Sequence, residues 1–112
     1  MIYMKEYSYR EGDRVLQKLI KSKDKEKKYA LTKHIKKKAI LRKINIAYIE
    51  KMLLTKEPLG LLSSRKNRFK VYFPSETDSN NDLIVVIAID SDDKIIGVTT
   101  YEDPISKREG IK

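Results

Sequence analysis

The sequence predicts an α+β domain in which N-terminal helices pack on one face of a mainly antiparallel sheet of about four strands. In the first half of the chain apolar residues recur at helical spacing, whereas from about residue 68 they alternate with polar residues or form short apolar runs. The helical segments precede the strands, and this order favours a two-layer α+β domain over an α/β fold. At 112 residues the chain fits one domain, without an internal repeat.

The first helix is expected over about residues 14–26. Gly12 and Asp13 provide a break followed by a helix N-cap, and apolar residues then recur at Val15, Leu16, Leu19 and Ile20. Residues 1–28 therefore comprise a tail and one helix, with the charged residues 23–28 as its solvated end or a loop. Residues 29–32 fit either a first strand or the lead-in to the next helix.

Two further helices are expected before residue 57. Residues 34–43 are good helix formers, although their apolar residues make no clean stripe. Asn45 is a suitable N-cap for the following helix, and Ile44 can pack onto Ile49 as a hydrophobic staple. The apolar face of that helix ends before Pro58, where a turn follows.

The rest of the chain predicts strands. Leu61–Ser63 can begin the sheet, and residues 68–73 alternate strictly, with Phe69, Val71 and Phe73 inward and Arg68, Lys70 and Tyr72 outward. Residues 83–89 are an uninterrupted apolar run, typical of a central strand covered on both faces. Residues 91–93 form a turn, residues 94–101 return as a partner strand that Asp103 and Pro104 terminate, and the last residues form a frayed tail.

The charge is unevenly distributed along the chain. Residues 1–43 carry a net charge of +10, residues 44–73 carry +4 and residues 74–112 carry −5, which together give the formal +9. A basic first half suggests a positive face that attracts a polyanion, and nucleic acid is the leading partner class. The alternative is that the lysines are solvated surface residues without a binding role.

Several functional classes are excluded. The chain has no cysteine, which removes disulfides and thiolate metal sites and favours a cytoplasmic location. No apolar segment resembles an export signal or a membrane span, so no membrane partner is expected. The common phosphate-loop, dinucleotide and zinc-hydrolase motifs are absent, so neither a cofactor nor a metal is expected. Five aspartates offer oxygen ligands for Mg²⁺, but their role as loop and turn residues is favoured: Asp78, Asp82, Asp90, Asp92 and Asp93.

His34 is the only histidine and therefore the natural candidate for acid–base chemistry near neutral pH. On a helix His34, Lys38 and Arg42 fall within an arc of about 80°. RNA carries its own nucleophile, the 2′-hydroxyl, so cleavage without metal needs only a base, cations on the phosphoryl oxygens and an acid. The alternative is that His34 is an ordinary surface or capping residue.

The strand after residue 67 offers a second candidate RNA contact. Its basic residues are interleaved with Phe69 and Tyr72, a pattern compatible with phosphate contacts and base stacking on single-stranded RNA. An ordinary exposed strand face is the alternative. The residues expected to hold the RNA backbone, here and in the preceding helical segment, are Lys37, Arg65, Lys66, Arg68 and Lys70.

The segment Thr32–Ile44 resembles the His-Ala-x-x-Arg-x-x-x-Arg-Gly-Ile signature of domain-of-unknown-function family 4258. His34 and Arg42 match the signature, Lys38 stands where arginine is usual, and Lys43 replaces the glycine. The resemblance extends over residues 29–102, with Tyr101 at the end of the last strand, and leaves residues 1–28 and 103–112 outside this core. That family is similar to RelE- and ParE-type toxins and to metal-independent barnase- and colicin-like ribonucleases.

The resemblance implies a RelE-like, toxin-type endoribonuclease that cleaves mRNA or rRNA by 2′-hydroxyl attack. His34 is then the general base or acid, Lys38 and Arg42 stabilise the phosphorane, and Tyr101 orients the substrate or donates a proton. An antitoxin protein is an implied partner, and a homodimer is possible. Two alternatives stay open: a non-catalytic RNA- or protein-binding module of a toxin–antitoxin-like system, and a structural or regulatory protein that contacts a partner through its acidic half.

Overall fold

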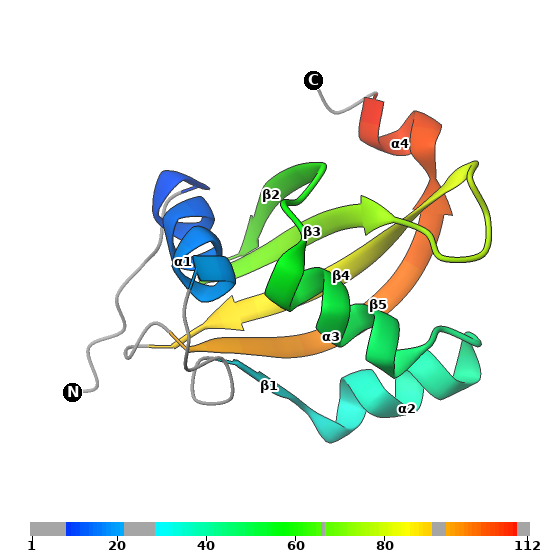
Figure 1. The fold of residues 1–112 in the computed structure, drawn as a ribbon, viewed down its shortest axis with the longest axis horizontal. Helices are drawn as coiled ribbons and strands as arrows, with labels where there is room; N and C mark the ends of the chain where they lie inside the picture. The colour runs from blue at the N-terminus through cyan, green and yellow to red at the C-terminus, as the bar shows by residue number, and fades with distance from the viewer. Residues whose placement is uncertain (1–8, 22–28, 66, 91–93, 110–112) are drawn as a thin grey trace.

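The computed structural model describes residues 9–21, 29–65, 67–90 and 94–109, in which helices pack on one face of a five-stranded sheet (Figure 1). The predicted α+β class is therefore confirmed. The elements, in chain order, are α1 Tyr9–Lys21, β1 Tyr29–Leu31, α2 Lys33–Leu41, α3 Ile46–Thr55, β2 Gly60–Arg65, β3 Arg68–Pro74, β4 Asn81–Ile89, β5 Ile95–Pro104 and α4 Ile105–Glu109.

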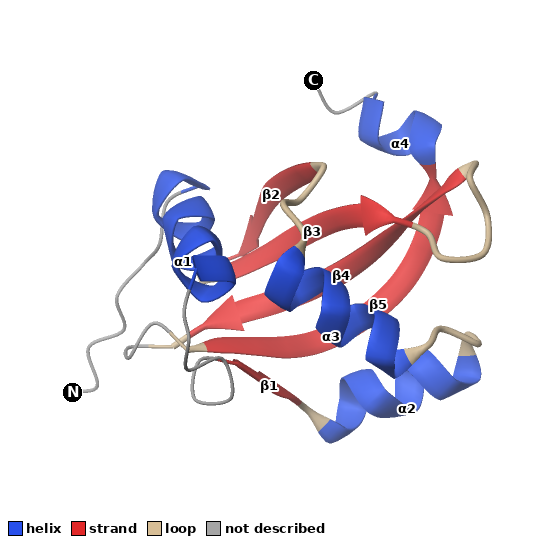
Figure 2. Ribbon diagram, viewed as in Figure 1, coloured by secondary structure: helices blue, strands red, loops and turns tan. Residues whose placement is uncertain are grey.

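The sheet has the strand order β1-β5-β4-β3-β2 and is larger than predicted. Strands β2 to β5 form an antiparallel meander, and β1 adds to its edge in parallel with β5, pairing Tyr29 with Ile95 and Leu31 with Gly97. The predicted number of about four strands is too small, because residues 29–31 form a strand through a partner far along the sequence, the first of the two alternatives for this segment. The mainly antiparallel character of the sheet is as predicted. Figure 2 shows the strands as one layer, with α1 and α3 across its near face and α2 beside β5.

Several predicted boundaries also move. Helix α1 begins at Tyr9 and continues through Gly12 and Asp13, so the predicted break and N-cap at these residues are wrong. Its predicted end and the charged segment 23–28 lie outside the described residues, as does the turn at residues 91–93. Strand β5 runs through Asp103 to Pro104, and the short helix α4 occupies part of the predicted C-terminal tail.

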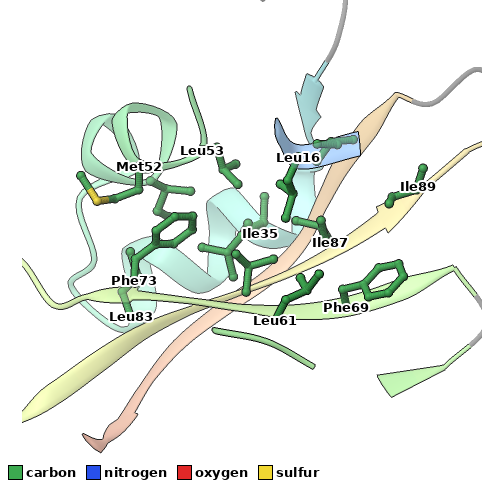
Figure 3. Packing of buried hydrophobic residues seen from close by; sticks show 14 of the residues in the cluster. Leu16, Ile35, Met52, Leu53, Leu61, Phe69, Phe73, Leu83, Ile87 and Ile89 are labelled. Carbon is green, nitrogen blue, oxygen red and sulfur yellow. The ribbon is translucent and has the colours of Figure 1, made fainter. Parts of the chain in front are cut away.

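The core lies between the helices and the sheet. The inward side chains of β3 and β4, including Phe69, Phe73 and Ile87, are completely buried against apolar residues from α1, α2 and α3 (Figure 3). Helix α1 contributes Val15 and Leu16, which are 4% and 1% exposed, so it belongs to the domain core and is not an appendage. Burial of each large apolar side chain stabilises the fold by roughly 1.5–3 kcal/mol.

Strand β4 is covered on both faces, as its apolar run predicts. Its other face carries Ile84 and Val86, which form a second, smaller cluster with Tyr72, packed against Leu62 and Tyr101. Tyr72 is only 6% exposed. The outward face of the sheet is therefore partly apolar, and Tyr72 is part of its packing.

Helix α2 has well-formed caps at both ends. The Thr32 hydroxyl accepts a hydrogen bond from the Ile35 amide (3.2 Å), as an N-cap residue does. At the other end Lys43 has a positive φ of 56°, and the amides of Lys43 and Ile44 donate to the carbonyls of Ile40 and Ala39. This is a Schellman motif, with a lysine where glycine is usual. Asn45 then caps α3, as predicted, by accepting from the Ala47 amide (3.0 Å).

Gly97 allows α2 and β1 to approach β5 closely. A Cβ atom at this position would lie 2.7 Å from Leu31 Cδ2 and 3.1 Å from Ile35 Cδ1. Since Ile35 is 1% exposed and packed in the core, it has little room to move.

We expect Gly97→Ala to lower the free energy of unfolding by about 1–3 kcal/mol, the usual cost of an overpacked core, measured by urea denaturation. Combining it with Leu31→Ala removes the closest clash, so the double variant should be more stable than the sum of the two single effects implies. Strict additivity of the two substitutions would contradict the proposed contact.

Candidate nucleic-acid interface

Helix α2 carries the densest basic surface in the described part of the chain. From Tyr29 to Ile49 the sequence contains six lysines and arginines and no aspartate or glutamate. The side chains of Lys33, His34, Lys36 and Lys37 are exposed, while Ile35 and Ala39 on the opposite side of the helix are buried. Among the residues described, none of these lysines forms an ion pair with a carboxylate. We call the exposed cations Lys33, Lys36 and Lys37 the α2 lysines.

The far end of α2 is anchored to the sheet through Arg42. A guanidinium nitrogen, Nη1, donates a 2.6 Å hydrogen bond to the carbonyl oxygen of Thr100 in β5. The guanidinium carbon lies 5.9 Å from the centroid of the Tyr101 ring, within the range of a cation–π interaction. The structure therefore brings together Arg42 and Tyr101, two of the four residues predicted to be catalytic.

The predicted catalytic histidine does not join this pair in a compact site. His34 lies in the first turn of α2 and Arg42 caps its last turn, so the two are separated by eight residues, or roughly 12 Å along the axis. Lys38 lies one turn before Arg42, and its side chain is partly buried. The four residues are therefore arranged along one helix and the neighbouring strand, and do not surround one point.

The residues predicted to contact RNA are divided between two surfaces. Lys37 lies on α2, whereas Arg68 and Lys70 lie on the face of β3 opposite the helices, where each is partly exposed. The side chain of Arg65, at the end of β2, and the whole of Lys66 lie outside what the structure describes. One RNA segment cannot be assigned to all five residues as a single patch.

The strand surface is less suited to RNA than its sequence suggests. Phe69 is completely buried in the core and Tyr72 is 6% exposed, so neither ring is available for base stacking. Burial raises the pKa of Tyr72, as do Tyr101, Asp103 and Asp82, while Lys70 lowers it. Asp82 and Asp103 lie opposite each other on β4 and β5 on this same face, so the strand surface carries both signs of charge.

The remaining polar groups near α2 have structural roles. A shallow hollow beside Lys43 and Asn45 is lined by Tyr48, Glu76 and Glu102. The Tyr48 hydroxyl donates to the Pro74 carbonyl (2.7 Å), and burial, followed by the charges of Glu76 and Glu102, raises its pKa. The carboxylates of Asp78 and Asp90 accept hydrogen bonds from backbone amides of their own loops.

The described residues contain no group of three histidine, cysteine, aspartate or glutamate side chains that could hold a metal ion. Among the same residues, no helix is both long and apolar enough to span a membrane.

Comparison with known proteins corrects the resemblance drawn from the sequence. Residues 13–87 match the model of the MJ0788 family. No curated protein and no solved structure matches the chain. The assignment to family 4258 and to RelE- or ParE-like toxins is therefore wrong. It depended on a short signature from which Lys38 and Lys43 depart, and it excluded α1, which the family match includes from Asp13 onward.

The predicted RNA contacts omit Lys33 and Lys36, which share the exposed surface of Lys37. The signal that identifies them is the absence of any carboxylate between Tyr29 and Ile49, a feature of the segment and not of any single residue.

We expect Arg42→Ala to lower the free energy of unfolding by about 1 kcal/mol, because the Thr100 carbonyl at the sheet edge loses its hydrogen bond. The melting temperature should fall by about 4 °C. Arg42→Lys keeps the charge but not the planar donor group, so its melting temperature should lie between those of the wild type and Arg42→Ala. Lys37→Ala is the matched control and should change stability by less than about 0.5 kcal/mol. Equal stability of Arg42→Ala and Lys37→Ala would show that the anchor contributes nothing.

Proposed function

The chain belongs to the MJ0788 family, and for this member we propose a function in binding RNA through the basic surface of α2, without cleaving it. The observation that carries the proposal is the set of cations on α2, which is exposed and has no carboxylate partner among the described residues. Lysines at a protein surface usually lie among acidic residues of similar number. A one-signed surface of this kind attracts polyanions by long-range electrostatic interaction and by release of the counterions of the phosphate backbone.

The geometry of α2 favours a flexible, single-stranded partner. The α2 lysines project from an exposed helix, and mobile ammonium groups contact phosphates without reading bases. At the end of the helix Arg42 reaches the sheet edge with its guanidinium group over the ring of Tyr101, and the pair offers a guanidinium plane and an aromatic ring. Unpaired bases stack on such groups, whereas bases inside a duplex are not accessible to them.

Binding without cleavage is proposed because catalysis would require His34 and Arg42 to act on one phosphate. His34 is roughly 12 Å along the helix from Arg42, and Arg42 already bonds the Thr100 carbonyl. The residues that bind a strand can be spread along it, but those that transfer protons must lie within hydrogen-bond reach of the reacting atoms.

The binding proposal predicts a specific salt dependence. For a fluorescent single-stranded RNA, the logarithm of the affinity should fall linearly with the logarithm of the salt concentration. Replacing the three α2 lysines together by alanine should make this slope less steep by about 2, since each phosphate contact on a single strand contributes about 0.7 to its magnitude. Fluorescence anisotropy over a range of salt concentrations measures both affinity and slope.

The control is a triple variant with the same loss of charge on other exposed lysines, Lys18→Ala, Lys51→Ala and Lys56→Ala. It should reduce the slope much less than the α2 variant does. If the two triple variants behave alike, RNA responds only to net charge and α2 is not its binding surface.

For cleavage, we expect labelled RNA to remain intact after prolonged incubation with the protein in excess EDTA. Denaturing gel electrophoresis measures the intact fraction. Cleavage by the wild type that disappears in His34→Ala, while the binding affinity stays unchanged, would instead establish the metal-independent ribonuclease activity predicted from the sequence.

A further inference from the structure

The end of α2 exposes two large apolar side chains next to each other. Ile40 is 72% exposed and Leu41 is 67% exposed, and the third exposed large apolar residue among those described, Leu59, is 47% exposed at a different site. Single exposed apolar residues are common on protein surfaces. Ile40 and Leu41 are both exposed to this degree and have lysines as neighbours, so they form a small apolar patch with a basic rim.

The fold does not use these two side chains. The Schellman motif at the end of α2 involves the backbone of Ile40, while the apolar contact that accompanies such a motif joins the residues at the positions of Ala39 and Ile44. Ile35 and Ala39 already supply the buried face of the helix. Residues 40 and 41 therefore point outward because of their helical phase, and polar residues would serve the fold equally well.

Lysines surround this apolar pair. Lys37 precedes Ile40 by three residues and Leu41 by four, so it lies beside both on the helix surface, and Lys36 lies one turn from Ile40. An occupant of the patch must therefore offer apolar groups in the middle and negative charge at the rim.

We propose that Ile40 and Leu41, with the α2 lysines, form a docking site for an acidic, amphipathic segment of another protein. Apolar side chains of that segment cover Ile40 and Leu41, and its carboxylates pair with Lys33, Lys36 and Lys37. In this interaction the apolar anchors provide affinity and the complementary charge provides orientation.

Other occupants fit the observations less well. An RNA backbone pairs with the lysines but gains little from two aliphatic side chains. A lipid surface needs an apolar face that runs along a whole helix, whereas α2 exposes apolar side chains only at its end. A second copy of the chain docking symmetrically through α2 would place lysines opposite lysines.

The probe is a labelled peptide of about 18 residues, long enough to form a helix, with leucine at i, i+3, i+4 and i+7 spacing, a few glutamates beside the leucine face and alanine elsewhere. The reference peptide has serine in place of leucine and the same number of glutamates. The wild-type protein should bind the leucine peptide about tenfold or more tightly than the serine peptide, as burial of part of two aliphatic side chains provides. The double variant Ile40→Ser/Leu41→Ser should lose this preference, and Leu59→Ser should retain it.

This inference shares the α2 lysines with the proposed RNA binding, so RNA and the acidic segment would compete for them. Only the segment uses Ile40 and Leu41, and the same variants therefore separate the two. The Ile40→Ser/Leu41→Ser protein should bind RNA with an affinity within about twofold of the wild type and keep its melting temperature, because both side chains are exposed. Replacing the α2 lysines should weaken the binding of both peptides. If the wild-type protein prefers the leucine peptide but does not bind RNA, the docking site is supported and the RNA-binding function is not.

Three results would overturn the proposal. The first is equal affinity for the leucine and serine peptides, which would indicate attraction by charge only. The second is binding to phosphatidylserine vesicles that depends on Ile40 and Leu41 while no leucine preference appears. The third is self-association of the wild-type protein in sedimentation velocity that the double serine variant abolishes, which would assign the patch to a second copy of the chain.

Discussion

The outer edge of β5 is the constraint on which the position of α2 depends. Strand β1 pairs with only three residues of β5. The β5 carbonyls from Gly97 onward would otherwise have no hydrogen-bond partner at this edge of the sheet. Thr32 bonds the first of them, its amide donating to the Gly97 carbonyl (3.1 Å) and its hydroxyl to the Val98 carbonyl (3.4 Å). Arg42 bonds the Thr100 carbonyl at the other end of the helix. Side chains at both ends of α2 thus replace a missing strand.

A β-bulge makes this arrangement possible. The register between β4 and β5 shifts between Val86 and Ile87, so that Val98 is the extra residue of β5. The carbonyls of both Gly97 and Val98 then bond Thr32. Since Gly97 has no side chain, Ile35 can approach the strand closely, and the buried face of α2 is fixed. The rotation of the helix that buries Ile35 is the same rotation that exposes the α2 lysines and the pair Ile40 and Leu41.

Periodicity predicted most elements of the fold, because helices and strands in this chain bury one face each. The strict alternation in β3 and the apolar run in β4 correspond to the observed burial, and the Asn45 cap begins α3 where expected. The choice between strand and helix for residues 29–31, the bulge at Val98 and the burial of Tyr72 could not be predicted in this way. Each depends on a partner distant in the sequence, and a local pattern carries no information about that partner.

The candidate site was only partly predictable for a related reason. The basic composition of α2 is visible in the sequence, and so is the side of the helix that His34, Lys38 and Arg42 share. Whether that side faces a substrate or the sheet edge is decided by tertiary contacts. Arg42 turned out to be bonded to β5, which gives it a structural role that a signature motif does not reveal. That Arg42 contacts both the Thr100 carbonyl and the Tyr101 ring could not be inferred from residue types alone.

Helix α2 also departs from several local rules of helix stability. It has no acidic residue in its first turn, where lysines oppose the positive end of the helix dipole. Lys33 and Lys37 are like charges one turn apart, which costs roughly 0.2–0.5 kcal/mol instead of stabilising the helix. Lys43 adopts a left-handed conformation that costs a residue other than glycine about 1–2 kcal/mol. Glutamates at the exposed positions and glycine at residue 43 would stabilise the same fold. Local conflicts of this kind are expected where a surface serves a purpose besides folding, and in α2 they coincide with the surface that we propose to bind RNA.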